Sequence, residues 1–343
     1  MNRKFILIIA MISLLVSCNG WLFRGIFSGP GKIETPIFDS IPVNFSDLNS
    51  EYDDYNSAYP PGLWGFDKEI SFSTNRLSEG GNFDFISYFV SIWYNYNEET
   101  LYEIRVSPVH ESYFRLSFNW INSEFDELGP YYWKVIYPPG NRQRLYSFMY
   151  SDNSSGNDDI KCKVFDRYQS PTNGEWNNTI SEVNGLERIN TEFNESYPSI
   201  RENELYFTSD RSGDYDIYLG YILNDNVLET FNIGLSDEVT LLNRLSGPAD
   251  DKCPFVLGDI MVYTSNRESG YGGFDLYYSI LSYDGWSSPI NFGEDINTEF
   301  DEYRPIIIPT DDHSGNNLMI FSSNRPGGKG GFDLYYVGVS KSF

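Results

Sequence analysis

One pattern occurs five times in this chain of 343 residues, and it limits the fold more than any other feature. Each copy has alternating apolar residues, a polar turn with Asn or Asp and Gly, and a second alternating run rich in Tyr, Phe and Ile. Such alternation around a turn predicts a β-hairpin, because Asn and Asp bond their own following backbone and Gly adopts positive φ. We place the five turns at Asn75, Asp152, Asp210, Asn266 and Asn324.

Two further elements accompany each hairpin. A pair of acidic or amide residues precedes an apolar strand that usually begins near a Pro, as in INTEFDEYRPII. A short outer strand also recurs, as in DGWSSPINFGEDIN. About four short strands per unit, with almost no helical periodicity, predict an all-β fold in which four-stranded sheets stack radially. This arrangement is a β-propeller.

The two ends of the repeat region predict how the propeller closes. The region begins with IPVNF, which matches the outer strand of a blade, and ends with FDLYYVGV, which matches a strand farther in. We therefore expect residues from about Pro36 to complete the last blade, in one propeller of five blades over 36–343. Six blades would require a degenerate unit between Phe83 and Gln143.

The N-terminal segment is typical of an exported protein. Arg3 and Lys4 precede a short apolar run that is too short to span a bilayer, and the LVSC sequence ending at Cys18 resembles a bacterial lipobox. We expect a signal peptide over 1–17, a lipid on Cys18 and a tether over 18–35, with the protein held at the outer membrane and facing the periplasm. The alternative is an ordinary secretory signal with an incidental Cys.

Charge and cysteine content exclude some classes of partner. Asp and Glu total 49 against 24 Lys and Arg, a net charge of -25, which repels nucleic acid. The two His are far apart, so we expect no metal site, and no motif indicates a cofactor. Cys162 and Cys253 fall in blades that are not adjacent, which predicts two buried free thiols rather than a disulfide.

The acidic pairs form a candidate site. If the pairs precede the innermost strands, they ring one mouth of the central channel, where they would attract a cation or a basic peptide. Residues that cap turns and link blades would repeat in the same way, so both interpretations stay open. The ring comprises Asp53, Asp54, Asp126, Glu127, Glu195, Asp250, Asp251, Asp301 and Glu302.

An Arg follows the turn in four of the five repeats, and we expect it to reach the Asp that begins the next strand and so to staple the turn. The expected pairs are Arg76 with Asp84, Arg211 with Asp216, Arg267 with Asp275, and Arg325 with Asp333. The second repeat departs from this pattern, because Asn153 takes the place of the Arg.

The segment from Trp93 to Trp133 is the least repeat-like part of the chain. Specific binding sites in repeat proteins are expected where a repeat departs from its pattern. Exposed aromatic side chains there can bind sugars or proteins. Packing between blades also uses many aromatic residues. The candidate partner surface comprises Trp93, Tyr94, Tyr96, Trp120, Tyr131, Tyr132 and Trp133.

The hairpins and the acidic-Pro strands resemble the WD40-like repeats called PD40, best known from the propeller of the Tol system's periplasmic protein. Phrases such as FSSNRPGGKGGFDLYY are also similar to propeller domains of Bacteroidetes outer-membrane lipoproteins. The resemblance covers about 36–343. It implies a scaffold that binds an envelope protein and catalyses nothing.

A second hypothesis belongs to a different class. Some five-bladed propellers are glycoside hydrolases, which need two carboxylates ~5 to 9.5 Å apart in unequal environments. The acidic residues repeat here, and none is marked out as the acid or the base, so we assign no catalytic residue. The alternative to the scaffold is a surface lipoprotein that binds carbohydrate or cleaves it as a glycoside hydrolase does.

Overall fold

The structure is a computed structural model that describes residues 38–61, 67–95, 100–108, 113–136, 143–310 and 314–341. The expected signal peptide, Cys18, the tether and Tyr96 lie outside the described residues. Among the helices that are described, none is long and apolar enough to cross a membrane.

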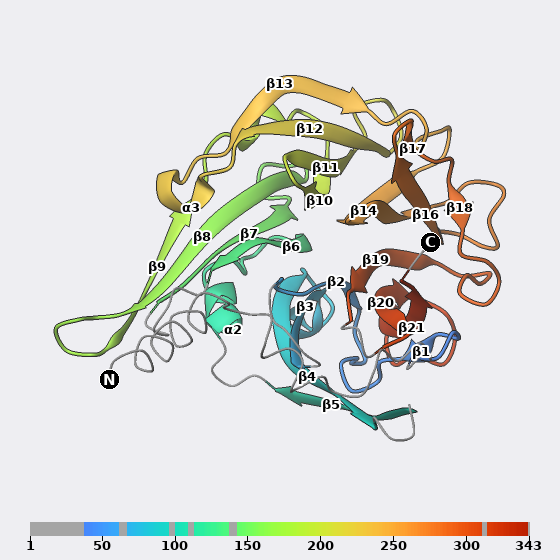
Figure 1. Cartoon of the computed structure of the whole chain (residues 1–343), viewed down its shortest axis with the longest axis horizontal. Helices are drawn as coiled ribbons and strands as arrows, with labels where there is room; N and C mark the ends of the chain where they lie inside the picture. The colour runs from blue at the N-terminus through green and yellow to red at the C-terminus, as the bar shows by residue number, and fades with distance from the viewer. Residues whose placement is uncertain are drawn as a thin grey trace, which may run out of the picture.

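The described strands form five antiparallel sheets arranged around an axis, as the sequence predicted (Figure 1). Blade one contains β2 (Asp54–Ala58), β3 (Asp67–Thr74), β4 (Asp84–Asn95) and β5 (Thr100–Pro108). Blade two contains β6 (Glu127–Ile136), β7 (Gln143–Asp152), β8 (Asp159–Gln169) and β9 (Trp176–Glu182). Blade three contains β10 (Glu195–Arg201), β11 (Glu204–Ser209), β12 (Asp216–Asn224) and β13 (Gly234–Leu241).

The remaining two blades vary the pattern at their outer edges. Blade four contains β14 (Asp251–Leu257), β15 (Ile260–Ser265) and β16 (Asp275–Ser282), with β17 (Gly285–Trp286) and β18 (Ile290–Asn291) both paired to β16. Blade five contains β19 (Glu302–Ile308), β20 (Asn316–Ser323) and β21 (Asp333–Ser340), with β1 (Val43–Asn44) at its edge. Short helices lie between strands: η1 (Arg76–Ser78), α2 (Tyr113–Phe118), η2 (Leu186–Arg188) and α3 (Val227–Thr230).

The ring closes through the N-terminal strand. β1 pairs antiparallel with β21, with Val43 opposite Tyr336, and the Asn44 amide donates to Asp333 at 3.1 Å. The prediction that the start of the repeat region completes the last blade is therefore confirmed. The innermost strands β2, β6, β10, β14 and β19 each contact the next one around the axis, so five blades close the ring without a sixth.

The core lies between neighbouring blades, where alternate residues of facing sheets pack together. Ile70 and Phe72 of blade one, for example, share a buried cluster with Ile306 and Met319 of blade five. This packing follows from the period of two in the sequence, which places every second side chain on the same face of a strand. Cys162 and Cys253 are both buried free thiols, as predicted.

Candidate binding site on the propeller axis

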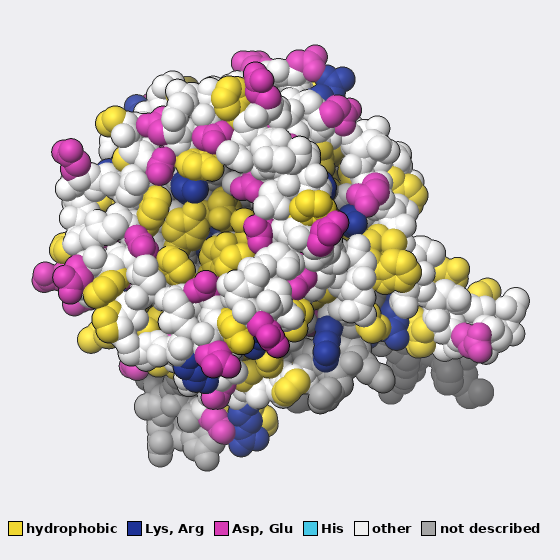
Figure 2. Space-filling view, turned by 180° about the vertical axis from the view of Figure 1, so that it is seen from behind, with side chains coloured by type: hydrophobic (Ala, Val, Ile, Leu, Met, Phe, Trp, Pro, Cys, Tyr) yellow, Lys and Arg dark blue, Asp and Glu magenta, His cyan; other side chains and the backbone are white. Residues whose placement is uncertain are grey.

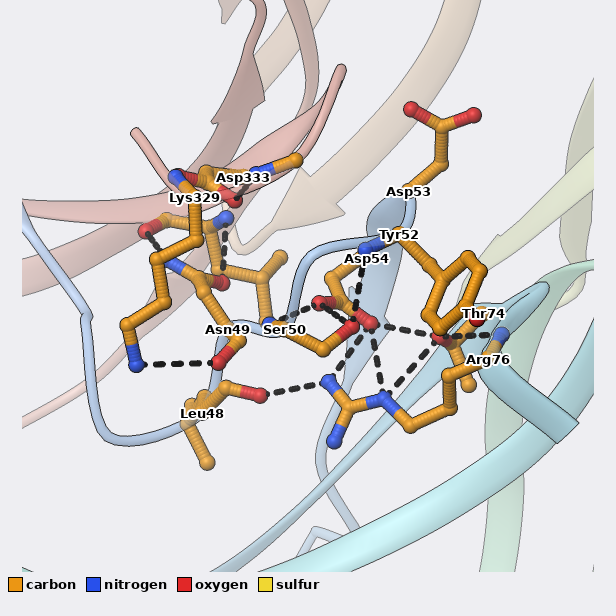
Figure 3. Close-up of polar contacts among 12 residues, drawn as sticks. Leu48, Asn49, Ser50, Tyr52, Asp53, Asp54, Thr74, Arg76, Lys329 and Asp333 are labelled. Carbon is orange, nitrogen blue, oxygen red and sulfur yellow. Dashed lines mark hydrogen bonds and ion pairs between the residues drawn. The ribbon is translucent and has the colours of Figure 1, made fainter. Parts of the chain in front are cut away.

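The arginines that follow the turns pair with a different acid from the one that the sequence predicted. Arg76 Nη2 lies 2.6 Å from the carboxylate of Asp54, not beside Asp84, and it also donates to the carbonyl of Leu48 at 2.7 Å (Figure 3). The side chain of Asp54 is fully buried, so its negative charge is strongly destabilised unless a cation pairs with it. The same pairing recurs for Arg211 with Glu195 and Arg325 with Glu302, both at 2.9 Å, and for Arg267 with Asp251.

The Asp residues that begin the third strands have other partners. Asp275 accepts a hydrogen bond from the backbone N–H of Tyr271 at 2.7 Å, and Asp333 accepts one from Lys329 N–H at 2.5 Å. Asp216 accepts one from the hydroxyl of Ser212. These carboxylates therefore close their own turns, and the proposed pairs of Arg76, Arg211, Arg267 and Arg325 with Asp84, Asp216, Asp275 and Asp333 are wrong.

In blade two the turn lies one residue later than the sequence predicted. The amide oxygen of Asn153 accepts from Asp126 N–H at 3.1 Å, which is the role that Asn75 plays for Asp53. Asn153 is therefore the turn residue, in place of Asp152, and Ser154 occupies the position of the missing Arg. Ser154 N–H donates to the side chain two residues earlier, as the corresponding Arg N–H does in other blades.

The acidic pairs are engaged in linking the blades. The first member of a pair accepts from a backbone N–H of the preceding blade: Phe332 to Asp53 at 2.7 Å, Phe83 to Asp126 at 2.9 Å, Tyr215 to Asp250 at 3.1 Å, and Phe274 to Asp301 at 2.9 Å. The second member is the buried acid that begins an innermost strand. Within the described residues no group of three His, Cys, Asp or Glu could hold a metal ion. These contacts favour the linking interpretation over a cation-binding ring.

The glycines of the GGFD sequences serve this linkage. A Cβ on Gly330 would overlap the carbonyl oxygen of Tyr52, and a Cβ on Gly331 would overlap the carboxylate of Asp53. Gly272 and Gly273 are equally close to the loop that leads into β19. By contrast, Gly213 and Gly327 have the positive φ that the turn prediction required. Only Gly allows both the turn and the close approach of consecutive blades.

The aromatic residues of the predicted partner surface do not form one surface. Trp93 lies on β4 and is exposed, with Arg105 over its ring at 5.6 Å. Trp120 follows α2 and is also exposed. Tyr131, Tyr132 and Trp133 belong to the innermost strand β6. Tyr132 is buried, and its hydroxyl is 2.7 Å from that of Ser71. Nothing is described of the side chain of Tyr94.

The innermost strands surround a cavity of about 460 Å³. Each of the five blades contributes to its wall, through Ala58, Tyr131, Ile200, Val256 and Ile306. These residues lie beyond the start of their strands, so the cavity opens at the mouth opposite to the acidic pairs. Figure 2, which shows the molecule from behind, has a hollow near the centre of the blades with a largely hydrophobic wall and a basic side chain inside it.

The rim of the cavity carries charge. Arg201, at the end of β10, donates to the carbonyl of Gly258 at 2.8 Å and pairs with Asp259 at 2.9 Å. These contacts join the hairpin of blade three to that of blade four. Glu202 and Asp259 are the carboxylates that line the cavity among the described residues, and both are largely exposed.

One position of every innermost strand has an unusual backbone. Two residues after the buried acid, each strand has a register shift and a residue with positive φ, between 50 and 59°. A β-bulge of this kind redirects a side chain, and a positive φ is unfavourable for residues other than Gly. The five residues are Asn56, Gly129, Tyr197, Cys253 and Arg304. Each is of a different type, although the residues around them repeat.

Three of the side chains at this position, those of Arg304, Tyr197 and Cys253, lie close together. Arg304 of blade five donates through Nη2 to the carbonyl of Pro130 at 3.2 Å, which belongs to a blade that is not its neighbour. The Arg304 guanidinium also lies over the ring of Tyr197, at 5.7 Å from its centroid. A Cβ on Gly129 would be only 2.9 Å from the Tyr197 ring, which explains why blade two has Gly here. Burial raises the pKa of the Cys253 thiol to about 11, so this neighbour stays uncharged near neutral pH.

The sequence analysis missed this position. The position lies within the repeated acidic-Pro element and holds its most variable residue, which stands directly before Pro in four of the five copies. The change from Asn to Gly, Tyr, Cys and Arg within a constant frame was the signal that could have found it.

Comparisons with known proteins give the fold and no family. No family model matches the sequence, and no curated protein matches it. An endo-arabinase from Bacteroides thetaiotaomicron has a similar structure, with a TM-score of 0.52 and 12% identity over 88% of this chain and 98% of that one. An N-acetylgalactosamine deacetylase from F. plautii gives a TM-score of 0.47 and 13% identity, covering 91% of this chain and 95% of that one.

These neighbours correct the functional expectation. The sequence analysis favoured a scaffold that binds an envelope protein, with no enzymatic activity. Among the solved structures similar to the chain there is also an exo-β-1,3-galactanase from Clostridium thermocellum, at a TM-score of 0.45 and 12% identity over 88% of this chain and 63% of that one. The neighbour with the TM-score of 0.52 is named as an enzyme, an endo-arabinase, which contradicts the expected non-catalytic scaffold, and that expectation is withdrawn.

Proposed function

We propose that this propeller binds a saccharide in its axial cavity, as a carbohydrate-binding or glycoside-hydrolase-like protein. The cavity itself is the observation on which the proposal rests: a hollow of about 460 Å³ at the centre of the blades, with aromatic walls and polar groups at its rim. Saccharides are bound in concave sites of this kind, where apolar ring faces pack on aromatic side chains and hydroxyls bond to a few fixed polar groups.

Two features fit a sugar better than a purely apolar ligand. Trp133 is partly buried and lines the cavity beside Tyr131 and Tyr132, so the wall is aromatic on this side. Arg201, Glu202 and Asp259 surround the rim with donors and acceptors. If the bound sugar is hydrolysed, Glu202 and Asp259 are the described carboxylates at the cavity that could act as acid and base.

Binding of α-1,5-arabino-oligosaccharides, followed by calorimetry, tests the proposal first, because a protein of similar fold is an endo-arabinase. A panel of other neutral oligosaccharides extends the test. Trp133→Ala should weaken binding about tenfold, as expected for losing one aromatic contact of about 1.4 kcal/mol. Trp93→Ala is the matched control, because Trp93 is exposed on β4 and does not line the cavity. Equal losses in both variants, or no binding of any oligosaccharide, would contradict the proposal.

Product analysis then separates binding from hydrolysis. Release of reducing ends by the wild type, but not by Glu202→Gln or Asp259→Asn, would identify a hydrolase. Tight binding without release of reducing ends would identify a carbohydrate-binding protein.

The cellular location is also a proposal. We propose that Cys18 bears a lipid that holds the propeller at the outer membrane, facing the periplasm, and that the repeats are of the PD40 type. The lipobox-like LVSC sequence and the repeated FDLYY strands support these two statements.

A further inference from the structure

Arg304 is the most unusual charged residue of the described structure. Its side chain is fully buried at the inner end of the axial cavity, whose rim residues Glu202 and Asp259 are exposed. Nη2 has one partner, the carbonyl of Pro130, whereas Nε and Nη1 have no hydrogen-bond partner among the described residues. A buried guanidinium with unused donors is strongly unfavourable unless an anion compensates it.

The surroundings of Arg304 supply no such anion. The titratable groups that face it are Tyr131, Tyr197, Cys253 and Tyr303, and burial raises the pKa of all four, so they are neutral near pH 7. The four turn arginines, by contrast, each pair with a buried carboxylate. The chain has about twice as many acidic as basic residues, 49 against 24, so a shortage of acidic residues does not explain why Arg304 lacks a carboxylate partner.

The type of residue at Arg304, and not its backbone, distinguishes blade five. Its positive φ, of 50°, is shared in sign by the corresponding residue of the other four innermost strands, so the bulge itself belongs to the architecture and only the type of residue differs between blades. Blade two has Gly at the same position of the bulge. The cost of burying an Arg at this position is understood if its guanidinium binds a ligand that enters the cavity.

We propose that the axial cavity selects an acidic saccharide, whose carboxylate binds the guanidinium of Arg304. The inference rests on the proposed function and names its substrate class. A guanidinium N–H donates a strong, charge-assisted hydrogen bond to a carboxylate, and the unused Nε and Nη1 of Arg304 each offer such a donor, on different edges of the group. The apolar wall that includes Tyr131 and Trp133 would then contact the ring faces of the sugar.

Calorimetry with trigalacturonate tests the inference, with the fully methyl-esterified trimer as a neutral ligand of the same shape. We expect the acid to bind the wild type at least tenfold more tightly than the ester. Arg304→Met should bind both forms about equally, and Arg304→Lys should retain part of the preference. Circular dichroism and thermal unfolding of the variants check that the fold is intact. If Arg304→Met does not fold, the comparison of acid with ester on the wild type still decides the result.

Three outcomes would overturn the inference. Equal binding of acid and ester by the wild type would show that the carboxylate is not recognised, and the proposed function would stand. Binding of neutral arabino-oligosaccharides without binding of trigalacturonate would have the same meaning. Competition by acetate as effective, mole for mole, as by trigalacturonate would show a site for free small carboxylates. If no saccharide binds, whether neutral or acidic, the proposed function is refuted as well.

Discussion

Replacing Glu127 with Gln should stabilise the propeller at alkaline pH and destabilise it slightly at acidic pH. Glu127 is the buried acid of blade two, where Ser154 stands in place of the Arg that neutralises this acid in the other blades. Its carboxylate accepts from the hydroxyl of Ser123 at 2.5 Å and from Ser123 N–H at 3.3 Å. Lys161 pairs with Asp152 at 2.6 Å. Burial, followed by the charges of Asp84 and Asp152, raises the pKa of Glu127 to about 7.

The sign and size of the effect follow from that pKa. An acid with a pKa of about 7 in the folded protein and 4.5 as its reference value is harder to ionise when folded, so ionisation destabilises the native state as pH rises from 4.5 to about 7. The cost grows by roughly 2.5 kcal/mol between pH 5 and pH 8.5, at 1.36 kcal/mol for each pKa unit. Glu127→Gln removes this cost and loses about 1 kcal/mol of hydrogen bonding to Ser123. The net gain at pH 8.5 is about 2 kcal/mol.

Urea unfolding of the wild type and Glu127→Gln at pH 5 and pH 8.5 measures the difference directly. Glu195→Gln is the matched control, because Glu195 begins the innermost strand of blade three and pairs with Arg211 at 2.9 Å. That substitution leaves a cation without its partner and should destabilise the fold by about 3 kcal/mol at both pH values. The reasoning is refuted if the difference between Glu127→Gln and the wild type does not change with pH.

Two other predictions concern the blade linkage and the anchor. Gly330→Ala should lower the free energy of unfolding by about 2 kcal/mol, because the new Cβ overlaps Tyr52. Gly247→Ala is the control, since the space around Gly247 is open, and it should change the free energy of unfolding by less than about 0.5 kcal/mol. Equal effects of the two substitutions in chemical denaturation would contradict the role assigned to Gly330. Cys18→Ser should move the protein from the membrane fraction to the soluble fraction of cells, and a variant that remains with membranes would rule out the lipid anchor.

The architecture could be predicted because its sequence pattern occurs five times in the chain. Alternation, turn residues and the IPVNF segment together predicted five blades and closure by the first strand, since each signal depends on local sequence. The pairing of the turn arginines could not be predicted in the same way. Asp54 and Asp84 both lie opposite Thr74 in the register, so spacing alone allowed Arg76 to reach either one. Their difference in burial became visible only in three dimensions.

The candidate site escaped prediction for a related reason. Aromatic residues between Trp93 and Trp133 were grouped because they are close in sequence, but β4 is the third strand of its blade and β6 is an innermost strand. The cavity instead combines residues from all five blades, such as Tyr131 and Arg304. A repeat analysis favours what is constant, whereas the site occupies the position at which the repeats differ.

The pairing of β1 with β21 has a consequence for how the protein is made. Asn44 and Asp333, which bond across this pair, are separated by 289 positions in the chain, so blade five cannot be completed until β21 has been synthesised. Contacts between such distant segments form slowly, because a long loop must close before they are gained. Until then β21 presents an unpaired edge that can associate with another strand. During biogenesis there is therefore an interval in which β1 must pair with β21 before a strand of a second molecule pairs with that edge.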